Sequence, residues 1–333
     1  MSDPKYDVLA IGNAIVDIIA RTEEDFLLRE GLAKSSMRLI DAAEADRLYD
    51  HMGPAIEASG GSAGNTAVGV ASLGGRAAFI GKVADDVFGK LYRHDMKASG
   101  VHFDTAPLSR GAPTARSMIL ITPDGERTMN TYLGACQALA PADIDARLVE
   151  ESLVTYLEGY LWDPPEAKDA FRRAARVAHG AGRQVSITLS DAFCVDRYRP
   201  EFLGLIRDKT IDILFANDSE LRSLYETASF ETAVEALRKD CRLAAVTVGA
   251  EGALVVTPDG VVKVPATPVD AVVDTTGAGD LFAAGFLFGF ARQMPLADAA
   301  RLGTIAAAEV IGHIGPRPAT PLAALAREAG FKI

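Results

Sequence analysis

The chain is poor in cysteine, with only Cys136, Cys194 and Cys241 among its 333 residues. An odd number of cysteines at such wide spacing predicts neither a disulfide framework nor a cluster of metal ligands. The five histidines are equally scattered. We therefore expect a protein without structural disulfides, in a reducing cytoplasm.

Positive charge and long apolar runs are also scarce. The 34 Lys and Arg residues are outnumbered by 45 Asp and Glu, which gives a formal net charge of −11. Such a balance predicts no nucleic-acid or anionic-membrane surface, so a small-molecule partner is favoured. No run has the length of a membrane span, and residues 1–6 lack the apolar core of a signal peptide. A cytoplasmic location is the expectation.

Two common nucleotide-binding motifs are missing. Gly81-Lys82 does not complete a P-loop, because Arg76 and Val83 stand where Gly and Ser or Thr are required. No Gly-x-Gly-x-x-Gly follows an expected strand either. The sequence thus predicts neither a P-loop protein nor a dinucleotide-dependent oxidoreductase.

A chain of 333 residues can form one large core, or one large domain with a smaller appendage, and its apolar patterning predicts an α/β class. From residue 141 onward, short β-branched runs alternate with helical periodicity, which favours a doubly wound, mostly parallel sheet with helices on both faces. Three extended segments, 103–108, 117–122 and 127–133, are separated by glycine and proline turns and predict an antiparallel insertion.

Ligands of such sheets collect at the carboxyl ends of the strands. Four polar or glycine-rich segments fall at expected strand ends: 12–13, 217–220, 247–249 and 277–280. Their coincidence favours a ligand site there over four unrelated turns.

Residues 274–280 read Asp-Thr-Thr-Gly-Ala-Gly-Asp, between an expected strand at 269–273 and an expected helix from 281. Gly277 and Gly279 let the backbone approach a ligand, and the unpaired amides of a helix start attract phosphate. Asp280 would repel a phosphate, but it suits a base that takes a proton from a hydroxyl. We infer phosphoryl transfer, with a helix acid that only balances the dipole as the alternative.

Other motifs leave alternatives open. Residues 60–64 match the Gly-x-Ser-x-Gly elbow of serine hydrolases with Ser62 as nucleophile, but residues 54–59 are a poor buried strand. A glycine turn against a ligand, with Asn65 as donor, is favoured. Asp17 lies among apolar residues and needs a partner, so it either caps a turn or grips a cis-diol together with Asn13. Glu220 is either a first-turn helix acid or a magnesium ligand through water.

Together these segments resemble the PfkB or ribokinase family of carbohydrate kinases from nearly end to end. Residues 60–66, 79–83 and 274–280 carry the resemblance, with the pair Asn217-x-x-Glu220. Segments 12–18, 25–27, 190–193 and 212–217 look more like the adenosine kinase branch.

The resemblance implies one ribokinase-like α/β domain over residues 1–333. It also implies a small β lid, made from about residues 15–41 and 101–133, that closes over the substrate. It implies an ATP-dependent kinase for the 5′-hydroxyl of a nucleoside, with adenosine favoured. The alternatives are a ribokinase-like sugar kinase or a guanosine or inosine kinase; a catalytically silent nucleoside-binding protein comes from another class. Monomer and homodimer both remain open.

The resemblance also implies residue roles. Asp280 would be the base, the backbone of Gly277, Ala278 and Gly279 would hold the transferring phosphate, and Arg127 would add positive charge. The residues expected at the acceptor are Asn13, Asp17, Gly61, Ser62 and Asn65 on the sugar, and Leu39, Leu133 and Tyr160 on the base.

For the phosphate donor, ATP is expected along Asn217, Thr247, Gly249, Gly252, Thr276 and Gly279. Glu220 would hold Mg²⁺ through water. A K⁺ site is expected beside Asp274 and the backbone near Gly315.

Overall fold

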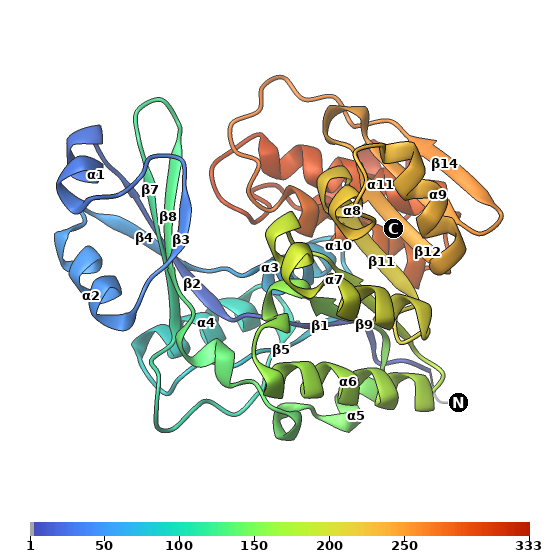
Figure 1. Ribbon diagram of the computed structural model, residues 1–333, viewed down its shortest axis with the longest axis horizontal. Coiled ribbons are helices and arrows are strands. Elements are labelled where there is room, and N and C mark those ends of the chain that lie inside the picture. Colours follow the sequence, from blue (N-terminus) through green and yellow to red (C-terminus); the bar gives the residue numbers. More distant parts are fainter. Residues whose placement is uncertain (1–2) are drawn as a thin grey trace.

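The computed structural model describes residues 3–333, which form two separate sheets (Figure 1). The larger sheet has nine strands in the order β14-β13-β12-β11-β10-β9-β1-β5-β6. Its strands from β12 to β6 in this order are parallel, whereas β13 and β14 run antiparallel at one edge. Their bounds are β1 Tyr6–Ile11, β5 Ala77–Ile80, β6 Val101–His102, β9 Ser152–Glu158, β10 Gln184–Thr188, β11 Ile213–Asn217, β12 Leu243–Thr247, β13 Ala253–Thr257 and β14 Gly260–Val264. The predicted doubly wound, mostly parallel sheet is confirmed.

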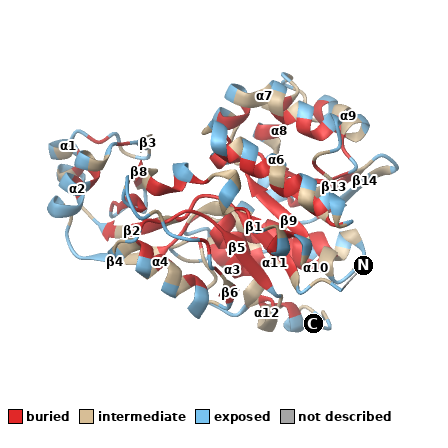
Figure 2. Cartoon of the chain, turned by 90° about the horizontal axis from the view of Figure 1, so that it is seen from below, coloured by how far each residue is buried: buried red, intermediate tan, exposed pale blue. Residues whose placement is uncertain are grey.

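Helices cover both faces of this sheet because its strands are apolar on both sides. In β1, Val8 and Ala10 join one core cluster, while Leu9 and Ile11 join the other. Figure 2 shows the buried strands between the two helical layers. The helices of the first layer are α3 Ser62–Ser72, α10 Ala278–Ala291 and α11 Leu296–Ile311; those of the second are α5 Ala146–Glu150, α6 Pro165–Gly180, α7 Ala192–Arg207, α8 Asp218–Leu224 and α9 Phe230–Asp240.

The small sheet lies beside the large one, at the left of Figure 1. Its five strands run in the order β3-β8-β7-β2-β4. Their bounds are β2 Ile15–Arg21, β3 Met37–Leu39, β4 Ala55–Ser59, β7 Ala115–Ile121 and β8 Arg127–Tyr132, and the helices α1 Glu24–Glu30 and α2 Ala42–His51 accompany them. Alternation gives the sheet two faces: Ile18 and Met118 pack in the core with Leu27 of α1, whereas Ile119 and Met129 line a cavity.

The remaining elements are short connections or cover the edges. They are the helices α4 Val87–Ala98 and α12 Leu322–Glu328 and the 3₁₀ turns η1 Gly134–Ala138, η2 Pro141–Asp143, η3 Gly159–Trp162 and η4 Gly249–Glu251. No helix within residues 3–333 combines the length and the apolar character needed to cross a bilayer.

The expected lid segments differ from the small sheet in three places. Val101–His102 pairs with β5 in the large sheet, and residues 103–108 form no strand beyond one bridge from Leu108 to Ala84. Residues 55–59, judged a poor buried strand, form the edge strand β4. β4 lies at the edge of the small sheet, so it is not covered on both faces, and Ile56 is 70 % exposed there.

The strand expected at 269–273 is wrong. Residues 265–276 form no helix or strand, and Val272 is 60 % exposed. The backbone amide of Val273 donates to the carbonyl of Ile311 at the end of α11, so this run is held by a helix end instead of a neighbouring strand. Strand propensity without a partner strand gives only an extended loop.

Candidate active site

A cavity of about 970 Å³ lies between the small sheet and the carboxyl ends of the large sheet's strands. Its size is at the upper end for small-molecule sites, so it has room for two ligands. The predicted site residues in its lining are Asn13, Asp17, Leu39, Gly61, Ser62, Asn65, Leu133, Tyr160, Asn217, Glu220, Thr247, Thr276, Gly277, Gly279 and Asp280. The predicted residues outside the lining are Arg127, Gly249, Gly252, Asp274 and Ala278.

The turn before α10 is built for close approach. Gly277 has a φ of 82°, and a Cβ at this position would lie 2.7 Å from the carbonyl oxygen of Pro316. Only glycine fits both conditions. The helix then starts at Ala278, with no side-chain cap on its first amides. The amide of Ala278 donates to the carbonyl of Thr275 at 3.2 Å. Amides that stay free at a helix start can stabilise a phosphate group.

Asp280 lies in the first turn of α10 and faces the start of α3. The hydroxyl of Ser62 donates to its Oδ1 at 2.6 Å, and Nδ2 of Asn65 donates to its Oδ2 at 2.9 Å. Burial raises the pKa of the Asp280 carboxyl, while these two hydrogen bonds lower it. A half-buried carboxylate held by neutral donors can accept a proton from a bound hydroxyl.

The hydrolase interpretation of Ser62 is wrong. A serine nucleophile needs a base that removes its proton, usually a histidine. Here the Ser62 hydroxyl donates to Asp280, and the described cavity lining contains no histidine. The strand before it, β4, is an exposed edge strand, not the buried central strand of such an elbow.

Glu158, at the end of β9, is a site residue that sequence patterns did not predict. It is 1 % exposed and lines the cavity. Asn13 donates through Nδ2 to its Oε1 at 2.7 Å, and the backbone amides of Asn13 and Ala63 donate to its Oε2 at 3.3 and 2.8 Å. Burial raises its pKa to about 7, against the lowering by these bonds. A glutamate that ends a buried apolar strand was the available clue.

Asp17 of β2 is 8 % exposed and packs against the glycine turn before α3. A Cβ at Gly60 would lie 2.2 Å from Asp17 Oδ2, so glycine makes room for the carboxylate. Burial raises its pKa to about 7; the charges of Arg317 and Arg127 lower it, and that of Asp280 raises it. The charges of two arginines therefore act on this acid, and the sequence did not indicate Arg317.

Arg127 connects the small sheet to the turn before α10. It leaves β8, donates to Thr276 Oγ1 at 3.1 Å and forms an ion pair with Asp274. Asp274 also accepts from the backbone amides of Thr276 and Gly315, both at 3.0 Å. A K⁺ ion needs oxygen ligands, whereas donors surround this carboxylate. The carboxylate of Asp274 in this arrangement does not fit a potassium site.

Asn217 and Glu220 form a capping box at the start of α8. Asn217 Oδ1 accepts from the Glu220 amide at 2.8 Å, and Glu220 accepts from the amide and Nδ2 of Asn217 at 3.0 and 2.6 Å. The first-turn interpretation of Glu220 is thus structurally satisfied. Burial raises its pKa to about 7. Thr247 lines the cavity nearby, while Gly249 and Gly252 have φ of 50° and 100° in the following turn.

Magnesium fits this end of the cavity only in its usual kinase form. Residues 3–333 contain no group of three His, Cys, Asp or Glu side chains that could hold a metal. Magnesium with a nucleotide needs one or two carboxylates, with phosphates and waters as its other ligands. Glu220 supplies one carboxylate at the cavity wall.

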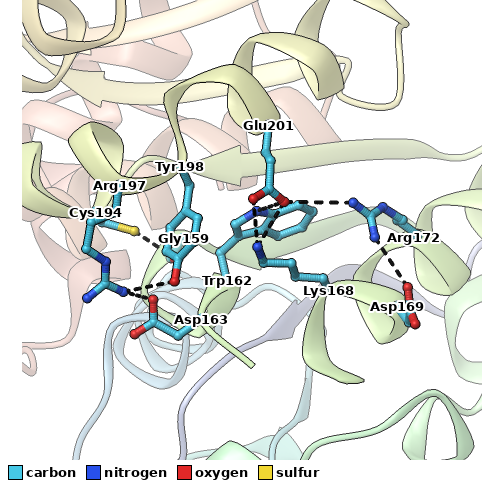
Figure 3. A network of polar contacts seen from close by, with 10 residues as sticks. All are labelled: Gly159, Trp162, Asp163, Lys168, Asp169, Arg172, Cys194, Arg197, Tyr198 and Glu201. Carbon is cyan, nitrogen blue, oxygen red and sulfur yellow. Dashed lines mark hydrogen bonds and ion pairs between the residues drawn. The ribbon is translucent and has the colours of Figure 1, made fainter. Parts of the chain in front are cut away.

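A polar network fixes the cavity wall made by η3 and α7 (Figure 3). Arg197 and Asp163 form an ion pair, and Sγ of Cys194 donates to the carbonyl of Gly159 at 3.3 Å. These three side chains line the cavity together with Tyr160, which is 41 % exposed. Further from the cavity, Glu201 binds Lys168 and Trp162 and joins the two helices α6 and α7 (Figure 3).

Comparisons with known proteins agree with this geometry. The family model of pfkB family carbohydrate kinases matches residues 7–323. An adenosine kinase from Sinorhizobium meliloti is 60 % identical, with a TM-score of 0.92, over 98 % of this chain and 100 % of that one. A probable sugar kinase from Rhizobium etli CFN 42 is 54 % identical, with the same TM-score of 0.92, over 98 % and 99 %.

A further relative is named for a different acceptor. The ATP-dependent ribose-1-phosphate kinase of Halopiger xanaduensis is 34 % identical over 81 % of this chain and 86 % of its own length. These proteins share a ribokinase-like fold, a large mostly parallel sheet flanked by helices with a second, smaller sheet. This chain belongs to the pfkB family of carbohydrate kinases, enzymes that transfer a phosphoryl group to a hydroxyl acceptor.

Proposed function

We propose that this kinase transfers the γ-phosphoryl group of ATP to the 5′-hydroxyl of adenosine, giving AMP and ADP. The observation that carries the proposal is the composition of one end of the cavity, here called the acceptor end, around Asn13, Asp17 and Asp280. The end around Asn217, Glu220 and Thr247 is called the donor end. Polar groups for a ribose, Asn13 and Asp17, lie in one cavity with apolar side chains, Leu39, Leu133 and Tyr160. Leu39 is 55 % exposed, and a purine base would cover it whereas a free sugar would not. The 60 % identity to an adenosine kinase supports the same acceptor.

In the proposed reaction Asp280 takes the proton of the 5′-hydroxyl as its oxygen bonds to the γ-phosphorus, and the bond from that phosphorus to the bridging oxygen breaks. Asn13 and Asp17 hold the ribose hydroxyls. Backbone amides at Gly277, Ala278 and Gly279 stabilise the charge on the transferring phosphate, and Arg127 adds positive charge beside them.

ATP would extend from this turn past Thr276 toward Asn217, Thr247, Gly249 and Gly252. Magnesium, when bound, would neutralise charge on the phosphates, with Glu220 holding it through water. We propose a cytoplasmic enzyme, since all three cysteines are free and buried. No step of this scheme needs potassium.

A sugar acceptor is the second candidate, favoured by the ribose-1-phosphate kinase and the probable sugar kinase among the similar proteins. Guanosine and inosine are further nucleoside alternatives. All of them would use the same phosphate chemistry, so the difference lies in how the acceptor end is filled.

The test is an acceptor panel at saturating ATP and Mg²⁺. Adenosine, guanosine, inosine, ribose, ribose 1-phosphate and fructose are ranked by kcat/KM, with AMP formation followed directly. We expect adenosine to rank first. A higher kcat/KM for a sugar, or no AMP at all, would overturn the proposal. Repeating the assay with KCl replaced at fixed ionic strength tests potassium dependence separately.

A further inference from the structure

Arg317 lies in the loop between α11 and α12, next to the turn that precedes α10. Its two preceding residues hold this loop in place. The Gly315 amide donates to Asp274, and Pro316 packs against Gly277 so closely that a Cβ there would clash. The backbone position of Arg317 is therefore fixed relative to the phosphate-binding turn.

The side chain of Arg317 extends from this loop to α3 and α4. Its Nε donates to Oδ1 of Asn65 at 3.3 Å, and its Nη2 lies 3.5 Å from Sδ of Met96. A Cβ at Gly64 would lie 3.7 Å from the same Nη2. The guanidinium group thus rests on the first turn of α3, beside the residues that bind Asp280.

The contact with Asn65 determines which end of its amide faces the base. Because Oδ1 accepts from Arg317, Nδ2 is directed at Asp280 Oδ2, to which it donates at 2.9 Å. The reverse orientation would place a carbonyl oxygen against the carboxylate and remove a donor from it. Arg317 consequently acts on Asp280 through Asn65.

Arg317 also carries charge into a site rich in acids. It forms no direct ion pair with any residue from 3 to 333, whereas Arg127, the other cation that faces Asp17, is paired with Asp274. The titratable groups that face Asp17, Arg317 or their direct neighbours are Arg127, Asp280, Tyr92, Asp95 and Glu158. Of the cations here, Arg317 is the one not committed to another acid.

We propose that Arg317 is a positioning residue for phosphoryl transfer: through Asn65 it orients Asp280 toward the acceptor hydroxyl, and its charge offsets that of Asp17. The inference rests on the proposed reaction with Asp280 as base. It does not depend on which acceptor the enzyme uses.

Two substitutions separate the two parts of this role. Arg317→Lys keeps the charge but loses the planar donor that meets Asn65, whereas Arg317→Gln keeps a donor and loses the charge. We expect Arg317→Lys to lower kcat about 10²-fold with the acidic limb of its pH profile unchanged, because a misplaced base is costly. Arg317→Gln should move that limb to higher pH, because the proposed hold of Asp17 on the ribose hydroxyls needs its carboxylate and the charge of Arg317 lowers the pKa of Asp17. The KM for ATP should change less than about twofold in both, since neither alters the donor end.

Chemical rescue and a matched control distinguish positioning from simple support of the fold. Added methylguanidinium should restore activity to Arg317→Ala, and Arg301→Gln, a surface arginine of α11 that binds the Ala329 carbonyl, should behave as the unmodified enzyme. Thermal melting accompanies each assay. Loss of kcat without rescue and without a shifted limb, or full activity in all three Arg317 variants, would overturn the proposal.

A readout independent of turnover keeps this inference separate from the proposed function. A carboxyl ¹³C NMR titration of the full-length protein should place the Asp17 midpoint at higher pH in Arg317→Gln than in the unmodified chain. An unchanged midpoint would count against Arg317 even in an active enzyme. Conversely, absence of AMP formation with the expected midpoint shift would remove adenosine as the acceptor and still support the charge effect of Arg317 on Asp17.

Discussion

The acceptor end and the donor end of the cavity are built in opposite ways. At the acceptor end, Asp17, Glu158 and Asp280 come from three different elements, and their neighbours lie far away in the chain; the bond from Asn65 to Asp280 spans 215 residues. At the donor end, Glu220 is satisfied by Asn217 three residues before it. The carboxylates of the acceptor end are held by tertiary contacts, whereas the carboxylate of the donor end is held within a single helix turn.

This difference has an energetic counterpart. Burial raises the pKa of Asp17 and of Glu158 to about 7, so the fold holds two carboxyls that are each costly to ionise. Burial also raises the pKa of Glu220 to about 7. Glu220 belongs to the capping box of α8, so its hydrogen bonds stabilise the helix and offset part of the cost of burying its carboxylate. We expect substitutions at the acceptor end to change catalysis strongly and substitutions at the donor carboxylate to change it weakly.

The largest effect is expected at Asp280. Asp280→Asn removes the proposed base, and kcat should fall about 10³-fold with acceptor binding retained. Steady-state kinetics and calorimetric binding measure the two properties. Asp298→Asn is the matched control, because Asp298 is also a first-turn helix acid, of α11. Equal losses in both variants would return Asp280 to the helix-dipole interpretation.

A smaller loss is expected at Glu158. Glu158→Gln presents an amide group to one of the three donors from Asn13 and Ala63, and an unsatisfied buried group costs about 1–3 kcal/mol. Acceptor kcat/KM should fall about 10²-fold, chiefly through KM, since that cost corresponds to such a factor. Glu220→Gln serves as the donor-end counterpart. If both variants change acceptor KM alike, the two ends are not independent.

Asp17→Asn should weaken the proposed binding of the ribose hydroxyls and raise the free energy of unfolding. The folded-state pKa of Asp17, about 7, lies above its ordinary value of 3.8, so folding favours the protonated form. The stability penalty is absent below about pH 4, develops as the pH rises toward 7 and is complete above it. At pH 8 the variant should be about 4 kcal/mol more stable than the unmodified chain, by urea unfolding, because a shift of about three pKa units corresponds to that energy. Equal stability of the two proteins at pH 8 would contradict this burial cost.

The smallest effect is expected at the donor end. Glu220→Ala removes half of a capping box and should lower the free energy of unfolding by about 1 kcal/mol. The Mg²⁺ concentration for half-maximal rate should rise, since the proposed water-mediated ligand is lost. Ser229→Ala removes the cap of α9, away from the cavity, and controls for helix stability alone. An identical Mg²⁺ requirement in all three proteins would confine Glu220 to capping.

The comparison also explains what the sequence could predict. Strand ends are visible as apolar runs that stop at glycine or polar residues, so Asn13, Asn217 and the turn before Asp280 were placed in one cavity. Glu158 and Arg317 were not, because their partners Asn13 and Asn65 lie 145 and 252 residues away. Local patterns contain no information on such pairings.

Strand assignments failed where pairing, not propensity, decided the outcome. Residues 269–273 contain three valines, yet no strand pairs with them. Residues Ala55–Ser59 lack a clear strand pattern but pair with β2 along their full length. A proline inside a helix likewise does not end it here: α7 is capped by Asp191 and continues past Pro200 to Arg207, with non-helical backbone angles at Tyr198.

The two sheets meet at residues that line the acceptor end. Only residues 12–14 separate β1 from β2, and residues 60–61 separate β4 from α3; these links contain Asn13 and Gly61. Any rotation of the small sheet must therefore change backbone torsions at these links. Occupancy of the acceptor end and the angle between the sheets are then thermodynamically coupled, so a molecule bound at Asn13 and Gly61 restricts that rotation, and a stiffer link strengthens binding in return.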